Sequence, residues 1–247
     1  MDERIMLANR VALVTGGSRG IGRGIAQALA RAGAVVAVNY RHRQDEAAAT
    51  VAEIERAEGT AIAVRADVAV RAEVEAMAER VSSELGPIDV LVNNAGIATI
   101  RSVDDITERD FDETLAVNLK SAFLCTQAVT PGMRKRGWGR IVNVSSVAAR
   151  GAGSVGVHYN ASKAGLEGLT RGYAARLAAD GITVNAIAPG LIDTEMAVPL
   201  KESGVADRLP VGRIGTPEEI GQAALMIIGN GFLTGQTIAV NGGGSFL

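Results

Sequence analysis

A tyrosine and a lysine four residues apart form the first pair of side chains in this sequence that could carry chemistry. In "HYNASK" (158–163), small residues separate Tyr159 from Lys163. Positions i and i+4 of a helix face the same side. A free phenol has a pKa of about 10, and a nearby ammonium group lowers that value because it favours the phenolate. The pair could therefore exchange a proton with an alcohol or a carbonyl oxygen near neutral pH.

A serine precedes this pair at the end of an apolar segment. Ser146 closes "RIVNVSS" (140–146), thirteen residues before Tyr159. Parallel α/β sheets bind ligands at the carboxyl ends of their strands, so this hydroxyl could hold a substrate oxygen. A Tyr-x-x-x-Lys pair alone is common by chance and usually marks a solvated helix face. Its combination with Ser146 favours a catalytic site.

The glycine-rich stretch "TGGSRGIG" (15–22) lies between a predicted strand and a predicted helix. Gly16, Gly20 and Gly22 allow a tight turn and a close approach of backbone to a ligand. The helix that follows offers unpaired N–H groups and a positive dipole to a phosphate. The spacing is G-x-x-x-G-x-G rather than the common G-x-G-x-x-G string, yet the context predicts a pyrophosphate site.

The literal G-x-G-x-x-G string occurs elsewhere, in "GAGSVG" (151–156). Val147 to Arg150 separate it from the preceding strand, so no helix is aimed at a phosphate there. We interpret this second stretch as a flexible loop.

A third glycine pattern supplies a rival interpretation. Gly16, Ser18 and Gly20 form G-x-S-x-G, the string of a hydrolase nucleophile elbow. A serine nucleophile needs a base, which would have to be His42, His158 or an aspartate. This pattern leaves a serine hydrolase as an alternative.

Short β-branched segments alternate with Ala-rich amphipathic ones along the chain. This alternation predicts βαβ crossovers, a parallel sheet and helices on both faces, in one doubly wound domain. Residues 191–215 hold two prolines and several glycines, and such a long irregular stretch is typical of a substrate lid. The predicted strands are 10–17, 34–40, 60–68, 88–96, 140–146, 181–190 and 237–243, and the predicted helices are 20–33, 47–57, one ending near 85, one beginning near 110, and 159–179.

Composition excludes several other classes. The 247 residues are 47% hydrophobic and 21% charged, with a net charge of −2, which fits a globular core and gives no general attraction to nucleic acid. One cysteine, Cys125, cannot form an internal disulfide and lies in an apolar helical stretch, where we expect core packing. His42 and His158 lack metal-ligand spacing, so no metal site is expected. The charged N-terminus and the lack of a long apolar run predict a cytoplasmic protein.

Together these motifs resemble the short-chain dehydrogenase/reductase superfamily in its classical branch, over essentially the whole chain. The matching stretches are "TGGSRGIG", "NNAG" (93–96), "VNL" (117–119), "NVSS" (143–146), "YNASK" (159–163) and "APG" (188–190). The resemblance implies an NAD(P)-dependent Rossmann-fold oxidoreductase.

The resemblance assigns a role to each catalytic candidate. Tyr159 would be the proton donor or acceptor, Lys163 would lower its pKa and hold a ribose, and Ser146 would orient the carbonyl. Asn118 would hold a water that links Lys163 to bulk solvent. Ser145 competes with Ser146, but the thirteen-residue offset to Tyr159 favours Ser146.

The resemblance also implies a set of cofactor contacts. Asp67 would meet the adenine, Asn93 would follow the cofactor along the fourth strand, and Thr194 would bond the carboxamide. The full implied set is Gly16, Ser18, Arg19, Gly20, Ile21, Gly22, Tyr40, Arg41, Asp67, Val68, Asn94, Ala95, Gly96, Tyr159, Lys163, Pro189, Gly190, Ile192 and Thr194.

The end of the second strand favours NADP(H) over NAD(H). An NAD-preferring protein usually carries an acid there for the ribose 2′-hydroxyl, whereas this chain reads "VNYRHR" with Asn39 and Tyr40. Arg19 and Arg41 could instead meet a 2′-phosphate through charge-assisted bonds.

Within the superfamily, "LPVGRIGTPEEIG" and "LTGQTIAVNGG" most resemble the 3-oxoacyl-(acyl-carrier-protein) reductases. Sugar and small-alcohol dehydrogenases share much of this pattern and remain the alternative, with a non-catalytic NADP(H)-binding regulator as a third. Two features differ from those reductases. Asp180 stands where they often have a basic residue, and the segment 226–236 before the last strand is shorter than usual. The basic run "RKRGWGR" (134–140) could dock an acidic acyl carrier beside the active-site mouth. By resemblance we expect a homotetramer.

Overall fold

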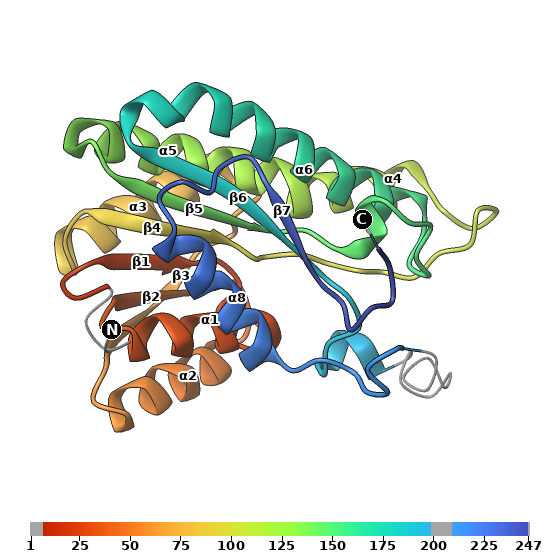
Figure 1. Ribbon diagram of the computed structural model, residues 1–247, viewed down its shortest axis with the longest axis horizontal. Helices are drawn as coiled ribbons and strands as arrows, with labels where there is room; N and C mark the ends of the chain where they lie inside the picture. Colours follow the sequence, from red (N-terminus) through yellow and green to blue (C-terminus); the bar gives the residue numbers. More distant parts are fainter. Residues whose placement is uncertain (1–6, 199–208, 247) are drawn as a thin grey trace.

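A seven-stranded parallel sheet forms the centre of the molecule (Figure 1). The computed structural model describes residues 7–198 and 209–246. The strand order is β3-β2-β1-β4-β5-β6-β7, so the chain reverses direction across the sheet between β1 and β4. The strands are β1 (Val11–Val14), β2 (Val35–Tyr40), β3 (Thr60–Arg65), β4 (Ile88–Asn93), β5 (Gly139–Val144), β6 (Ile182–Pro189) and β7 (Thr237–Val240). The predicted doubly wound fold is confirmed.

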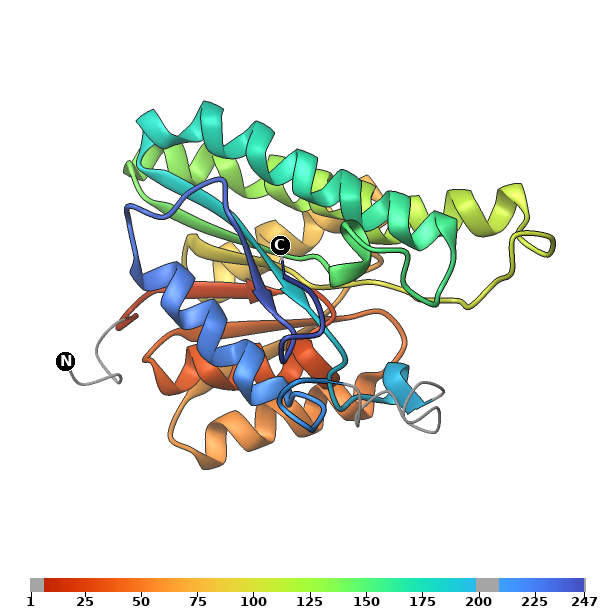
Figure 2. The ribbon, with the colours of Figure 1, turned by 45° about the vertical axis from the view of Figure 1, so that its right-hand side comes forward.

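Helices cover both faces of the sheet (Figures 1 and 2). One face carries α1 (Gly20–Arg31), α2 (Gln44–Arg56) and α8 (Pro217–Gly229), and the other carries α3 (Arg71–Glu84), α5 (Ser121–Arg136) and α6 (Val157–Leu177). A short helix, α4 (Glu108–Leu115), runs into α5 through a π-helical turn at Ala116–Lys120. No helix in residues 7–198 and 209–246 is both long and apolar enough to cross a membrane.

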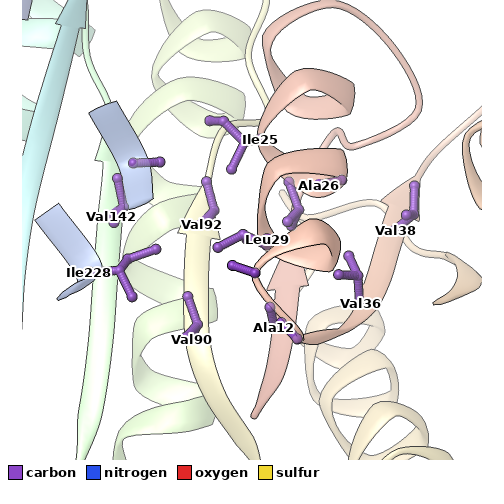
Figure 3. Close-up of a cluster of buried hydrophobic side chains, with 14 of the residues drawn as sticks. Ala12, Ile25, Ala26, Leu29, Val36, Val38, Val90, Val92, Val142 and Ile228 are labelled. Atoms are coloured by element: carbon purple, nitrogen blue, oxygen red, sulfur yellow. The ribbon is translucent and has the colours of Figure 1, made fainter. Parts of the chain in front are cut away.

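Alternation along the strands divides the core into two layers. Ala12 of β1 faces α1, where it packs with Ile25 and Leu29 (Figure 3). Val14 of β1 belongs to the same cluster. The intervening residues of β1 face the other layer, which contains the predicted core residue Cys125, 1% exposed. Because both faces are covered, the central strands are apolar on both sides.

Two features differ from the predicted elements. The helix expected from about residue 110 is interrupted by the π-helical turn, and α8 is not among the segments predicted from periodicity. Thr216 and Glu219 form a reciprocal capping box at the start of α8, which is a local signal for a helix N-terminus. Part of the predicted lid, residues 199–208, lies outside the described residues.

Candidate functional site

The glycine loop takes the conformation that the sequence predicts for a phosphate site. Gly16 and Gly20 have positive φ values of 60° and 52°, which favour glycine. A Cβ on Gly22 would lie 2.2 Å from the carbonyl oxygen of Gly16, so no larger residue fits there. The first turn of α1 has no side-chain cap, and its N–H groups therefore suit the pyrophosphate of a dinucleotide.

Side chains at the ends of β2 and β4, the two strands that flank β1, hold this loop. The Asn94 amide donates to the carbonyl oxygens of Thr15 (2.9 Å) and Gly16 (3.0 Å). The side-chain oxygen Oδ1 of Asn39 accepts from the backbone N–H of Gly16 at 3.2 Å. Asn39 is 2% exposed, and sequence reasoning considered it only as a missing acid. The signal in the sequence that could have indicated its role is a polar residue one position before the end of β2.

Tyr159 and Lys163 share one face of α6, as predicted. The Lys163 Nζ lies 5.7 Å from the centroid of the Tyr159 ring and donates to the Val144 carbonyl oxygen at 2.8 Å. A Cβ built on Gly96 would lie 3.7 Å from that Nζ and 3.3 Å from Asn118 Oδ1. The structure therefore brings the helix pair, the end of β4 and the π-helical turn together.

The two serines at the end of β5 have different surroundings. Ser145 is 3% exposed, and its hydroxyl donates to the Lys163 carbonyl oxygen at 3.2 Å. Ser146 is half-buried and forms a hydrogen bond with the Tyr159 phenol. Only Ser146 therefore combines some exposure with contact to the phenol, as the offset to Tyr159 predicts.

Burial changes the proton affinities of the pair. It raises the pKa of Tyr159, while the hydrogen bond with Ser146 acts in the opposite direction. Burial also lowers the pKa of the Lys163 ammonium to about 8. The expected net depression of the phenol pKa is therefore wrong for this structure, because desolvation outweighs the hydrogen bond with Ser146. At neutral pH the phenol carries its proton, and the lysine is largely charged.

Asn118 lies in the π-helical turn between α4 and α5, and its side chain is bound to protein groups. Its Oδ1 accepts from the Ile97 N–H at 2.8 Å, and its Nδ2 donates to the Ile97 carbonyl oxygen at 3.0 Å and to Ser162 Oγ at 3.1 Å. Both N–H bonds are used, so only the second lone pair of Oδ1 remains for the water that the resemblance implies. Such π-helical insertions are frequent at functional sites.

Asn93 does not follow the cofactor, and this expectation is wrong. It is 4% exposed, and its amide donates to Asn143 Oδ1 at 2.9 Å and lies 3.4 Å from Thr126 Oγ1. These partners lie on β5 and α5. Asn93 is therefore part of a buried polar chain inside the domain, whereas Asn94 holds the glycine loop.

The expected adenine end contains paired charges. Arg41 Nη1 lies 3.2 Å from Asp67 Oδ2, and the other carboxylate oxygen of Asp67 accepts from the Ala69 N–H at 2.9 Å. Tyr40 ends β2, and Val68 follows Asp67 beyond β3. Arg41 thus already has a carboxylate partner at the place where a 2′-phosphate was expected.

The start of the predicted lid crosses the glycine loop. Gly190 follows β6 and donates to the Val240 carbonyl oxygen at 2.9 Å, and Ile192 pairs with Gly215. A Cβ on Gly20 would lie 3.1 Å from the Thr194 methyl carbon. Gly190, Ile192 and Thr194 therefore lie on a segment that runs from Pro189, the last residue of β6, toward the start of α1.

Two alternatives from the sequence find little support. Ser18 is 5% exposed, and the His158 ring nitrogen Nε2 is 3.0 Å from the Thr99 carbonyl oxygen, so no described contact gives Ser18 a histidine base. The 151–156 stretch is a loop before α6, as interpreted from sequence.

The basic run does not lie beside the active-site mouth, and that expectation is wrong. Arg134 to Arg136 end α5, directly before the amino end of β5, whereas the glycine loop and Ser146 follow the carboxyl ends of their strands. Strands of about six residues separate the two edges by roughly 20 Å. Asp180 does share the rim with the basic run, because it forms an ion pair with Arg134 at 2.7 Å.

Comparisons with known proteins agree with this geometry. A family model described as short chain dehydrogenase matches residues 10–204. The acetoacetyl-CoA reductase of Rhizobium meliloti strain 1021 is 44% identical, over 96% of this chain and 99% of its own length. A 3-oxoacyl-(acyl-carrier-protein) reductase of Staphylococcus aureus strain Mu50 is 41% identical, over 96% of this chain and 99% of its own length.

Two solved structures have the same fold. A protein provisionally assigned as a gluconate dehydrogenase of Agrobacterium tumefaciens aligns with a TM-score of 0.92 and 34% identity, over 98% of both chains. A blue fluorescent protein from a metagenomic library, in complex with NADPH, aligns with a TM-score of 0.89 and 39% identity, over 96% of this chain and 98% of its own.

The sheet, the uncapped helix and the glycine loop define a dinucleotide-binding protein of the Rossmann class. The chain belongs to the short-chain dehydrogenase/reductase family, and it is an NAD(P)-dependent oxidoreductase.

Proposed function

We propose that this protein reduces a ketone to a secondary alcohol with NADPH, and that the ketone is a 3-oxoacyl thioester. The observation that carries the chemistry is the group formed by Ser146, Tyr159 and Lys163 beside the glycine loop. The substrate class is supported by the names of the relatives, a reductase of acetoacetyl-CoA and one of 3-oxoacyl-carrier substrates.

The protein side of the reaction is proton transfer. Ser146 donates a hydrogen bond to the carbonyl oxygen, and Tyr159 donates its proton to that oxygen as negative charge develops on it. The raised pKa of the phenol suits this direction, because the acid is loaded at neutral pH. The nearby Lys163 ammonium then stabilises the phenolate. The bound cofactor supplies the hydride.

We expect residues from several elements to hold the cofactor. The first turn of α1 would bind the pyrophosphate, Lys163 would reach a ribose, and Asp67 would lie beside the adenine. Preference for NADPH is supported by Tyr40 in place of an acid and by Arg19, Arg41 and a residue that sequence reasoning missed, Arg43. The lid at 191–215, as far as it is described, would cover the nicotinamide.

The alternative is an oxidoreductase of sugars or small secondary alcohols. It is favoured by the similarity to the protein provisionally assigned as a gluconate dehydrogenase. Both substrate classes can use the same proton-transfer group. The choice between them would therefore depend on the substrate pocket beside the lid. An acyl carrier remains a proposed partner. It would not dock through Arg134 to Arg136, because these residues lie at the opposite edge of the sheet from the site.

The test is NADPH oxidation with acetoacetyl groups on carrier protein and on a minimal pantetheine, beside aldoses, quinones and cyclic ketones. The proposal expects the highest kcat/KM for a thioester, and a preference for the carrier form would support the partner. Negligible rates on both thioesters with fast turnover of a sugar or simple ketone would select the alternative. Reaction of Ser18 with a fluorophosphonate would instead indicate a hydrolase.

A further inference from the structure

Glu195 connects the start of the lid with two arginines of the cofactor edge. It is the first residue of a short 3₁₀ turn, Glu195–Ala197. Its Oε2 accepts a hydrogen bond from Arg19 Nη1 and lies 3.8 Å from Arg43 Nη2. Arg19 precedes α1 and Arg43 precedes α2, so a single lid carboxylate bridges two separate elements of the dinucleotide-binding half.

A second carboxylate, that of Glu46, forms ion pairs with the same two arginines. Glu46, in the first turn of α2, lies 2.6 Å from Arg43 Nη1 and 4.0 Å from Arg19 Nε. The Glu46 side chain is 28% exposed, whereas the Glu195 side chain is 64% exposed. Glu195 is therefore the carboxylate that an incoming anion can displace at the lower cost.

An anion at this place would compete for the same donors. A phosphate ester carries up to two negative charges and accepts strong charge-assisted bonds from guanidinium groups. The arginines lie at the start of α1 and just beyond β2, which is where the ribose of a dinucleotide meets this fold. The Glu195 carboxylate thus occupies donors that a 2′-phosphate would use.

We infer that Glu195 is a specificity-determining residue that acts as an internal competitor of the 2′-phosphate. This inference rests on the proposed NADPH cofactor. NADPH must displace Glu195 from Arg19 and Arg43, and the displaced carboxylate also repels the phosphate. NADH has no such group, so it leaves the contact between lid and arginines in place. Glu195 therefore reduces the ratio by which NADPH binds more tightly than NADH. Because phosphate binding breaks the contact between Glu195 and the two arginines, it also frees the start of the lid.

The experiment measures dissociation constants of NADPH and NADH by calorimetry for the wild-type protein and Glu195→Gln. The amide keeps the size of the side chain but removes its charge. We expect NADPH to bind about two- to fivefold more tightly, in the range of exposed ion pairs, and the NADH constant to stay within about twofold. The gain should shrink at high salt because the groups are exposed.

The matched control is Glu218→Gln. Glu218 is exposed in the first turn of α8 and takes no part in these ion pairs, so its variant removes the same charge without freeing Arg19 or Arg43. Unchanged or weaker NADPH binding in Glu195→Gln would overturn the inference, as would an equal gain in Glu218→Gln. If the wild-type protein also binds NADH more tightly than NADPH, the cofactor proposal fails as well. If the wild-type protein does prefer NADPH, such a result would overturn only the role of Glu195 and leave the cofactor proposal in place.

Discussion

At the scale of single residues, the phenol of Tyr159 is the group on which the proposed chemistry depends. Tyr159→Phe should lower turnover by about 10²- to 10⁴-fold, because it removes the general acid, and leave NADPH affinity nearly unchanged. The matched control is Tyr173→Phe. Tyr173 lies on α6 like Tyr159 but away from the site, and its hydroxyl accepts a hydrogen bond from Gln127 of α5. Steady-state kinetics and cofactor titration check both variants. Near-normal turnover of Tyr159→Phe would remove Tyr159 from the mechanism.

Lys163 should give the reduction an alkaline limit. Its pKa of about 8 means that the ammonium is charged below this pH and neutral above it. The kcat/KM for reduction should therefore fall as the pH rises through about 8, where the stabilising charge disappears. Tyr159 should not add a second limit there, because burial raises its pKa. A kcat/KM that stays flat between about pH 6.5 and 9.5 would contradict this role.

Arg41 is the residue to change for cofactor preference. Arg41→Asp should shift preference from NADPH toward NADH, because the new carboxylate repels a 2′-phosphate and accepts bonds from a ribose hydroxyl. It would also face its present partner, Asp67, with a like charge, so the shift should come with weaker binding overall. The ratio of kcat/KM for the two cofactors is the measurement. A wild-type protein that already prefers NADH would invalidate the reasoning.

Residue types and spacing predict the positions of Tyr159, Lys163 and Ser146, but not the direction of the pKa shift of the Tyr159 phenol. The i, i+4 spacing is a local property and holds in the structure. The direction of the phenol pKa depends on how much protein surrounds it, and that is set by segments distant in the chain. Asn93 shows the same limit, since its direction is set by Asn143, fifty residues away in the sequence.

At the scale of elements, the turn between β1 and α1 is the part of the cofactor site most sensitive to volume. Gly22→Ala would place a Cβ against the Gly16 carbonyl oxygen, so the loop must shift, and we expect at least a tenfold loss of NADPH affinity, about 1.4 kcal/mol. Gly151→Ala is the control in the literal G-x-G-x-x-G string. Its Cβ would meet only the Val147 oxygen, at an ordinary 3.5 Å. Calorimetry should show a loss for Gly22 alone, and the reverse result would mean that the wrong glycine motif has been assigned.

Most elements follow from the sequence because apolar runs and glycine turns are local signals. The π-helical turn could not be predicted from the sequence, since its one extra residue per turn does not alter the apolar pattern around Asn118 in a recognisable way. Its position is fixed by tertiary bonds to Ile97 and Ser162. The basic run at the end of α5 was misplaced for a related reason: a helix periodicity does not say which end lies beside the site.

At the scale of the whole molecule, several apolar groups remain exposed. Phe232 is 98% exposed and Phe246 is 92% exposed, and β7 is an edge strand whose outer side has no partner among the described residues. The exposed side of α6 carries mainly small residues, among them Ala161, Ala164, Gly168 and Ala175. Such surfaces are typical of contacts between subunits. They support the expectation of a tetramer with dihedral symmetry, which would cover both the β7 edge and the α6 face.

Light scattering should give a mass four times that of the 25.5 kDa chain. Ala164→Glu puts a charge on the small-residue side of α6, where a partner helix would have to desolvate it, so we expect a smaller assembly at micromolar concentration. Val103→Glu is the control, because Val103 is 76% exposed in the loop before α4, and it should keep the full mass. A wild-type monomer would rule out the tetramer. An unchanged mass for Ala164→Glu would move the contact away from this face of α6, leaving the β7 edge to join the subunits.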